Sequence, residues 1–176
     1  AGGPKNISEG KTYSKIGAWV DEYEFDWKRW RIPPGSLPQI DLCQQWAVSV
    51  SAAALEDAGY LGDGATSNLP REKTGVVFAN ALGGENRTRS TERVLIDRYQ
   101  RHAKEAGISD DAFSRFKTSL LDGAPRVDED TMPGELANVV AGRVANMLDL
   151  RGPNFTTDAA CASAMAAVMD ACHLLH

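Results

Sequence analysis

The sequence has no run of 18 apolar residues, so it predicts no transmembrane helix. It has no excess of basic side chains. Its net charge of −5 argues against nucleic acid or an anionic membrane surface as the main partner. Three widely spaced cysteines do not make a disulfide framework, and no apolar signal segment opens the chain, so we expect a reducing, cytoplasmic setting. What remains is an ordinary globular composition, and 176 residues suit one domain.

Motifs for nucleotides and metals are incomplete. Gly83 and Gly84 follow a short apolar run, but no Gly-Lys-Ser/Thr sequence completes a phosphate-binding loop. Cys172 and His176 are four residues apart on a predicted helix, which is a spacing that metal ligands use. Two ligands do not make a structural zinc site, so we expect no cofactor and no metal, and we predict packing roles for these two side chains.

Alternating strand-like and helix-like segments predict an α/β fold with a parallel or mixed sheet flanked by helices. Short β-prone runs cover residues 75–79 and 154–157. Asp41 is a predicted N-cap, Gln44 completes a capping-box pattern, and Gly59 is the expected stop of the same helix. Further helices are predicted over residues 91–106, after residues 109–111 with Phe113, Phe116 and Leu120 as the buried stripe, over residues 131–147, and over residues 162–175.

Two of these segments, residues 41–58 and 162–175, are apolar nearly all round, so we expect both helices to be buried rather than to lie on a surface. The helix over residues 91–106 carries many charges and is predicted to be a solvated surface helix. Residues 12–40 are rich in aromatic side chains, including Trp19, Trp27 and Trp30, and we expect a loop that these side chains hold against the core.

Cys161 lies where the β-prone run at residues 154–157 gives way to the last helix. A thiol at a helix N-terminus meets the positive end of the macrodipole, and the first-turn N–H groups can bind a developing oxyanion. Alanines at positions 159, 160 and 162 keep the turn narrow, as in a nucleophile elbow with cysteine in place of serine. A free cysteine among alanines is also commonly a small core residue, so the local pattern leaves both interpretations open.

The segment from Thr157 to Ala164 resembles the active-site segment of the β-ketoacyl synthases, the condensing enzymes of fatty-acid and polyketide synthesis. Other parts of the chain resemble the same family in register, so the resemblance covers residues 12–176. The stretches Arg31-Ile32-Pro33-Pro34 and Gln39-Ile40-Asp41 are most similar to ketosynthase domains of multidomain polyunsaturated-fatty-acid synthases. The remaining stretches that carry the resemblance are residues 54–60, 74–78, 138–146 and 150–153.

This resemblance implies a thiolase-like fold, of which the sequence holds part of the N-terminal half, with a buried helix after the Cys161 strand. We expect residues 1–11 to be a flexible lead-in and residues 12–176 to be a partial ketosynthase domain without its first strand and C-terminal half. The resemblance also implies that Cys161 accepts an acyl group, that acyl carrier protein is the partner, and that the complete domain is a homodimer. It places Met132 and Ala162 near the acyl pocket.

The family uses two histidines and a lysine that lie downstream of its cysteine. His173 and His176 follow Cys161 by 12 and 15 residues, roughly 18 and 22 Å along one helix at a rise of about 1.5 Å per residue. His102 lies in no similar motif. The resemblance therefore assigns no catalytic histidine here, and we expect the chain alone to be inactive in condensation. The alternative is a non-catalytic structural or interaction fragment, or a proteolytic remnant, in which Cys161 is inert.

Overall fold

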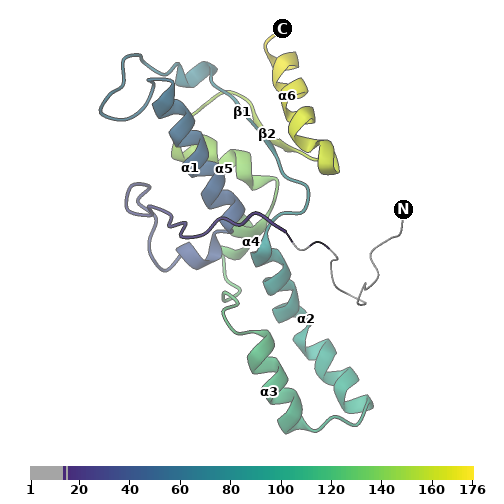
Figure 1. The fold of residues 1–176 in the computed structure, drawn as a ribbon. Coiled ribbons are helices and arrows are strands. Elements are labelled where there is room, and N and C mark those ends of the chain that lie inside the picture. The colour runs from purple at the N-terminus through teal and green to yellow at the C-terminus, as the bar shows by residue number, and fades with distance from the viewer. Residues whose placement is uncertain (1–13, 15) are drawn as a thin grey trace.

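The computed structural model describes residue 14 and residues 16–176, so the lead-in predicted over residues 1–11 lies outside the described part. The described residues form an elongated molecule with a mixed α/β body and a projecting helical arm (Figure 1). In chain order the elements are η1 (Leu37–Gln39), α1 (Leu42–Asp57), η2 (Arg71–Lys73), β1 (Val76–Ala79), α2 (Glu85–Glu105), α3 (Asp110–Leu120), α4 (Thr131–Glu135), α5 (Val139–Met147), β2 (Asn154–Thr157), η3 (Ala160–Ala162) and α6 (Ser163–Leu174), where η denotes a 3₁₀ helix.

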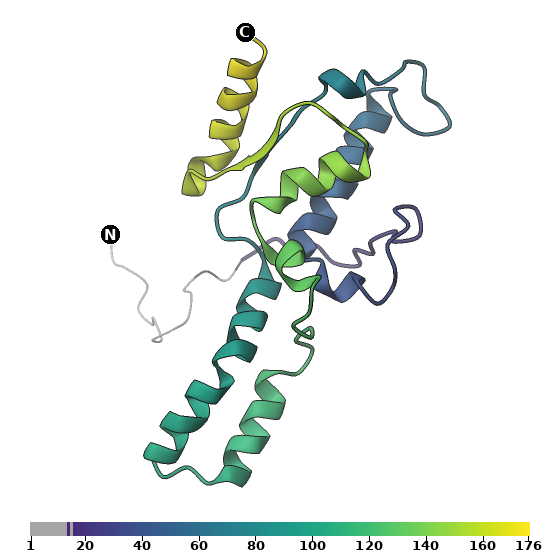
Figure 2. The same cartoon turned by 180° about the vertical axis from the view of Figure 1, so that it is seen from behind.

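The sheet of the body consists of β1 and β2, which pair in parallel with Val76 opposite Asn154 and Ala79 opposite Thr157. Both strands were predicted from their apolar or β-prone runs, and both are confirmed. Helices α1 and α5 lie on one side of the sheet and α6 lies on the other (Figure 1, Figure 2). Because the strands are parallel, both end at the same edge, and the turns that follow them share that edge.

The main core lies between α1, α5 and the sheet. Val48 on α1 has no exposed surface, and Val140 and Val144 on α5 are 1% exposed. Small neighbours, including Ala47 and Ala141, let the two helices approach closely. Complete burial of each valine stabilises the fold by about 1.5–3 kcal/mol relative to exposure, so these contacts hold the body together.

Residues 16–36 cross the body as a loop without helix or strand, as their composition predicts. Phe25 is buried in the main core, and Trp27 and Trp30 pack against it. Trp19 is 83% exposed, so the prediction that the aromatic side chains hold the whole loop against the core is wrong at its N-terminal end.

Asp41 joins three elements from the N-terminus of α1. Its Oδ1 accepts a hydrogen bond from the Cys43 N–H at 2.9 Å, which confirms the predicted N-cap. Its Oδ2 accepts from the Asn86 N–H at 2.8 Å in the first turn of α2, and its own N–H donates to the Gly134 carbonyl at 2.9 Å. A Cβ added at Gly84 would lie 1.7 Å from Asp41 Oδ1, so only glycine allows this carboxylate to cap both helices.

The predicted capping box is wrong, and the helix predicted over residues 131–147 is two helices, for one shared reason. Gln44 reaches across to α4 instead of back to its own N-cap, and its Nε2 donates to the carbonyls of Pro133 at 3.1 Å and Leu136 at 3.2 Å. Its Oε1 accepts a hydrogen bond from Arg143 Nε. Two carbonyls that a continuous helix would use internally are therefore engaged by Gln44, and the chain breaks between α4 and α5.

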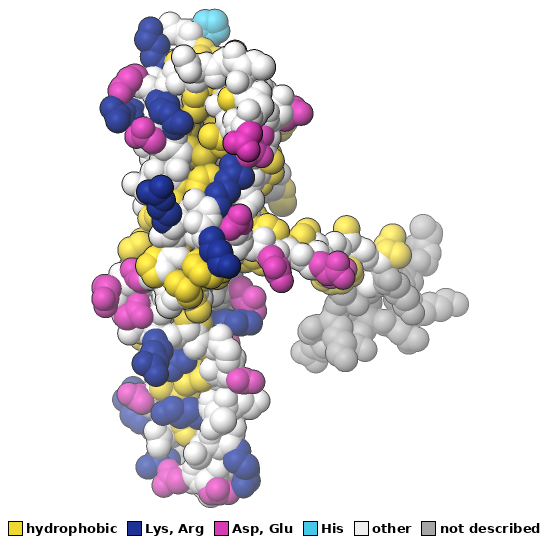
Figure 3. Space-filling model, turned by 90° about the vertical axis from the view of Figure 1, so that its left-hand side faces the viewer, with side chains coloured by type: hydrophobic (Ala, Val, Ile, Leu, Met, Phe, Trp, Pro, Cys, Tyr) yellow, Lys and Arg dark blue, Asp and Glu magenta, His cyan; other side chains and the backbone are white. Residues whose placement is uncertain are grey.

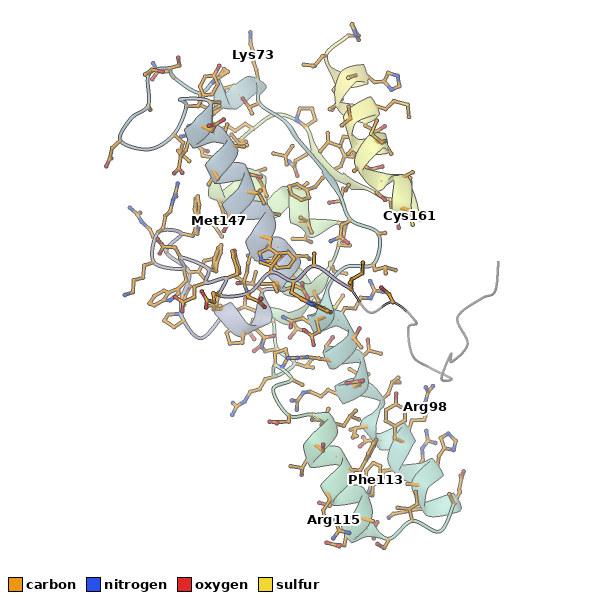
Figure 4. All side chains as sticks on the ribbon, viewed as in Figure 1. Lys73, Arg98, Phe113, Arg115, Met147 and Cys161 are labelled. Carbon is orange, nitrogen blue, oxygen red and sulfur yellow. The ribbon has the colours of Figure 1, made fainter. Side chains whose placement is uncertain are left out.

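Helices α2 and α3 form the arm, which has a small core of its own. Its buried side chains are Ile96, Ala103 and Phe113, and Figure 4 places Phe113 between the two helices. The prediction that Phe116 is also buried is wrong, because its side chain is 49% exposed. Two helices that pack mainly on each other cover only a narrow stripe of each.

The arm has a charged surface, as the sequence predicts, and side chains of both signs cover it in Figure 3. Helix α2 begins at Glu85, six residues before its predicted start, because the distant Asp41 carboxylate supplies a cap that the local sequence does not. Among the described residues, no helix is long and apolar enough to cross a membrane.

The prediction that the helices over residues 41–58 and 162–175 are buried on all sides is wrong. On α1, Val50 is 60% exposed. On α6, Met165 is 71% exposed, and Leu175 directly after this helix is 86% exposed. Helix α6 packs on the two strands with its small residues, of which Ser163 and Ala167 are buried. A two-stranded sheet covers one stripe of a helix, and nothing else in the described chain lies over its outer face (Figure 1).

Candidate active site

The turn that carries Cys161 lies at the carboxyl edge of the sheet. Strand β2 ends at Thr157, Cys161 lies within η3, and α6 begins at Ser163. Figure 4 shows Cys161 at the start of α6, next to the end of the sheet. The structure therefore places Cys161 at the strand-to-helix junction that the sequence indicates. In parallel α/β sheets, this edge is where ligand sites are found.

The Cys161 turn has an unusual backbone. Ala160 has a φ of +50°, in the left-handed region that costs a residue with a Cβ about 1–2 kcal/mol. Hydrogen bonds on both sides offset this cost. Asp158 Oδ1 accepts from the Ala160 N–H at 2.9 Å. Ser163 Oγ accepts from the Ala159 N–H at 2.8 Å and donates to the Ala160 carbonyl at 2.6 Å.

The three free cysteines have different surroundings. Cys43 lies half-buried in the first turn of α1, and burial together with the neighbouring Asp41 carboxylate raises its pKa to about 12. Its thiol is therefore neutral near pH 7 and a poor nucleophile. Cys172 is exposed, near the C-terminal end of α6. Cys161 is exposed at the opposite end of α6, where the helix macrodipole favours negative charge.

The loop after β1, residues 80–84, shares the edge with the Cys161 turn. The Asn80 N–H donates to the Thr157 carbonyl at 3.2 Å and extends the strand pairing by one residue. Asn80 Oδ1 accepts from the Gly83 N–H at 2.8 Å and closes the loop. A phosphate does not fit at the two glycines, because the Asp41 carboxylate already lies against Gly84 and binds an N–H of the first turn of α2.

Leu82 is a candidate site residue that the sequence prediction missed. Its side chain is 91% exposed, at the same edge of the sheet as the exposed Cys161 thiol. A large apolar side chain in this place can line the path of an apolar substrate chain. The sequence shows a leucine between a predicted strand and two glycines. It does not show that Leu82 lies at the same edge of the sheet as Cys161, because that depends on the pairing of β1 with β2.

Residues 2–176 match the family model described as beta-ketoacyl synthase, N-terminal domain. The chain belongs to this family. The match covers nearly the whole sequence and confirms the resemblance to β-ketoacyl synthases. A ketosynthase is a transferase, and this family has a thiolase-like fold, of which the mixed α/β body with its small parallel sheet is a fragment.

Curated relatives of this ketosynthase domain are large synthases. The chain is 29% identical over 183 residues to one subunit of the polyunsaturated fatty acid synthase from Thraustochytrium sp., covering 98% of this chain and 6% of that protein. It is 30% identical over 173 residues to polyketide synthase ThaG of Burkholderia thailandensis, covering 98% of this chain and 2% of that protein. It is 30% identical over 159 residues to mellein synthase of Phaeosphaeria nodorum, covering 90% of this chain and 7% of that protein. The chain thus spans a small part of each relative.

The two residues predicted to lie near the acyl pocket are on different elements of this ketosynthase domain. Ala162 is exposed and adjacent to Cys161 in η3. Met132 is 56% exposed on α4, which packs against α2, α5 and η1. The structure therefore brings Ala162 to the Cys161 turn and leaves Met132 on a separate helix of the body.

The histidines of the ketosynthase domain lie away from the Cys161 turn. Helix α6 runs unbroken from Ser163 to Leu174, so His173 is roughly 18 Å from Cys161 along the helix, at about 1.5 Å per residue. His176 follows the end of α6, and His102 lies on the arm, 3.1 Å from a Glu105 carboxylate oxygen. In residues 14 and 16–176, no three side chains of the types that bind metals come together.

Proposed function

We propose that this chain is the acyl-accepting part of a β-ketoacyl synthase, with Cys161 as the nucleophile. The observation that carries the proposal is the exposed Cys161 thiol on a hydrogen-bonded turn at the N-terminus of α6, in a chain of the ketosynthase family. The relatives named as polyunsaturated fatty acid and polyketide synthases support an acyl substrate. The partner is then an acyl carrier protein that delivers acyl groups as phosphopantetheine thioesters, and the complete domain acts as a homodimer.

In the first step, the Cys161 sulfur attacks the carbonyl carbon of the acyl thioester. The new carbon–sulfur bond places negative charge on the carbonyl oxygen of a tetrahedral intermediate. The bond to the carrier sulfur then breaks, and the carrier thiolate takes up the proton that Cys161 lost. Backbone N–H groups at the start of α6, including that of Cys161, are the donors proposed for the oxyanion. Leu82 and Ala162 would contact the acyl chain.

In the second step, a malonyl unit on the carrier protein loses carbon dioxide. The resulting carbanion attacks the carbonyl of the Cys161 thioester, forms a carbon–carbon bond and releases the Cys161 thiolate, which leaves a 3-ketoacyl product on the carrier. The enolate oxygen of the malonyl unit needs hydrogen-bond donors, and the three histidines of this chain lie far from Cys161. We therefore propose that other parts of the ketosynthase supply these donors and that residues 1–176 alone form no 3-ketoacyl product.

The test uses the full-length protein that contains this chain. Cys161→Ala should abolish acyl transfer from a carrier-protein thioester, while the matched Cys172→Ala variant keeps it. A limiting amount of iodoacetamide should label Cys161 before Cys43 and Cys172. The proposal fails if Cys161→Ala retains acyl transfer or if either of the other thiols is labelled first.

The exposed apolar side chains of α6 favour a second candidate for residues 1–176 by themselves, an inert fragment or remnant. Isolated residues 1–176, incubated with acyl and malonyl carrier-protein thioesters, should give no 3-ketoacyl product above a control without enzyme. Product above that control would show that the chain is a complete catalyst and would overturn the proposal that other parts of the ketosynthase are needed.

A further inference from the structure

We infer that Ser163 is a positioning residue for the nucleophile, since its hydroxyl holds the backbone on the N-terminal side of Cys161 in the conformation that presents the sulfur. The inference rests on the proposed function of Cys161. Ser163 itself is not available to attack the substrate, because it is 6% exposed and its hydroxyl is already used in the turn. Its role would be indirect, through the Ala159 N–H and the Ala160 carbonyl, which precede Cys161 in the turn.

The Ser163 hydroxyl closes the turn around Cys161. It accepts a hydrogen bond from the Ala159 N–H at 2.8 Å and donates one to the Ala160 carbonyl at 2.6 Å. A serine hydroxyl has one donor and two lone pairs, so both roles are available at once. The two bonds hold the chain on both sides of Ala160, and the peptide unit of the Ala160 carbonyl contains the Cys161 N–H. Both bonds are partly buried because Ser163 itself is buried, which limits competition with water.

The turn needs this support because Ala160 is in the left-handed region, with a φ of +50°. Asp158 contributes a bond to the Ala160 N–H, but that bond is exposed to solvent. Without the Ser163 hydroxyl, the favoured right-handed conformation of Ala160 would rotate the Ala160–Cys161 peptide group. The Cys161 N–H and sulfur would then lose their fixed relation, although the thiol would stay exposed.

This geometry predicts different effects on two reactions of Cys161. Acyl transfer needs the sulfur and the oxyanion donor in a fixed relation, and small misplacements of such groups cost about 100-fold. Alkylation by iodoacetamide develops no oxyanion and needs only an accessible thiolate. Ser163→Ala in the full-length protein should therefore lower kcat for acyl transfer by about 10- to 100-fold, with little change in KM. The rate of Cys161 alkylation should stay within about threefold.

Four further variants separate positioning from general stability. Ser163→Thr keeps the hydroxyl and should retain acyl transfer within about threefold. Adding Ala160→Gly to Ser163→Ala should recover about threefold or more, because glycine adopts a positive φ without steric cost. Adding Ala159→Gly instead should recover nothing, since Ala159 has a φ of −134° that alanine already tolerates. Ser109→Ala, at the N-cap of α3, is the matched loss of a serine cap elsewhere and should leave acyl transfer unchanged.

Each result of these assays either supports or contradicts the positioning role of Ser163. The inference stands if Ser163→Ala loses acyl transfer, keeps alkylation and is rescued by Ala160→Gly. It falls if Ser163→Ala keeps full kcat, or if acyl transfer and alkylation fall together, because that pattern reports loss of fold. Cys161→Ala, assayed in parallel, reports on the proposed function itself. If Cys161→Ala is active, the nucleophile is wrong, whereas an inactive Cys161→Ala with a fully active Ser163→Ala contradicts only the positioning role.

Discussion

The two faces of the sheet are covered in opposite ways. On the α1 and α5 face, large apolar side chains such as Val48 and Val144 point inward and are almost completely buried. On the α6 face, the small residues Ser163 and Ala167 are buried, while Met165 is 71% exposed and Val168 is 56% exposed. The first face is therefore covered by other residues of the described chain. The second presents its larger side chains outward, and no other described residues cover them.

The two faces therefore have different expected roles, one in the stability of the fold and the other in the proposed acyl transfer. The α1 and α5 face contains Cys43, whose pKa of about 12 makes it unreactive near pH 7. The α6 face begins with the exposed Cys161 turn. Substitutions on the first face should therefore change stability, and substitutions at the start of the second should change acyl transfer.

The largest expected effect is on the isolated chain, residues 1–176, which should self-associate through the outer face of α6. Each large apolar side chain left in water forgoes about 1.5–3 kcal/mol, and several together approach the whole stability of a domain, about 5–15 kcal/mol. Sedimentation velocity should show aggregates or oligomers, and Met165→Glu with Met169→Glu should reduce them. The matched control is Val94→Glu, which is 69% exposed on the charged arm and should have no effect. A soluble monomer with one cooperative unfolding transition would contradict the claim that the outer face of α6 needs cover from outside residues 1–176.

Asp41→Ala should destabilise the body next most strongly, because one carboxylate caps both α1 and α2. A lost cap costs about 0.5–2 kcal/mol, so two caps cost about 1–4 kcal/mol. Native-state hydrogen exchange of α1 and α2 amides in the full-length protein measures this loss. Ser109→Ala removes a single cap from α3 and should cost about 1 kcal/mol there. Equal losses for both variants would contradict the double-cap role.

A matched pair of valine truncations compares the two faces directly. Val144→Ala, at 1% exposure, should lower the free energy of opening of α5 by about 2 kcal/mol, from two lost methyl groups plus the cavity. Val168→Ala, at 56% exposure in this chain, should cost nearly nothing unless another part of the full-length protein covers α6. If Val168→Ala lowers the free energy of opening by about 1–2 kcal/mol in the full-length protein, another part of that protein packs on this face of α6.

The smallest effect concerns pH and Cys43. Its folded pKa of about 12 lies above the ordinary value of 9.0, so the protonated thiol favours the folded state. This contribution is fully present below pH 9.0 and is lost as the pH rises from there toward about 12. The thermal unfolding midpoint of the body should therefore fall between about pH 8 and about pH 10.5, and fall less in Cys43→Ala. An identical decline in both proteins would assign the pH dependence to other groups.

Local features of the fold could be predicted from the sequence because they depend on neighbouring residues. The strands at residues 76–79 and 154–157 follow from short apolar or β-prone runs. Asp41 and Ser109 cap their helices through bonds two or three residues away, and Gly59 follows α1 with a φ of +76°.

The errors come from contacts between distant residues. The early start of α2 depends on Asp41, and the break between α4 and α5 depends on Gln44, 89 residues from Pro133. The apolar composition of residues 162–175 indicates a helix that needs cover on several sides, but which of its side chains face the sheet depends on how α6 packs on β1 and β2.

At the candidate site, the position of Cys161 at a strand-to-helix junction could be predicted from local pattern and from the family resemblance. The role of Ser163 depends on a hydroxyl that bonds two peptide groups of one turn, and Leu82 depends on the pairing of two strands. The poor reactivity expected of Cys43 follows from burial and from the Asp41 carboxylate two residues earlier, and the extent of that burial depends on tertiary packing.

The most direct test of the central claim is to trap the acyl-enzyme. The full-length protein is incubated with an acyl carrier-protein thioester in the absence of malonyl units, quenched in acid, digested and measured by mass spectrometry. The account predicts one acyl group on the peptide that contains Cys161, absent in Cys161→Ala and strongly reduced in Ser163→Ala at short times. An acyl group on Cys172 or Cys43, or full acyl transfer in Cys161→Ala, would contradict it.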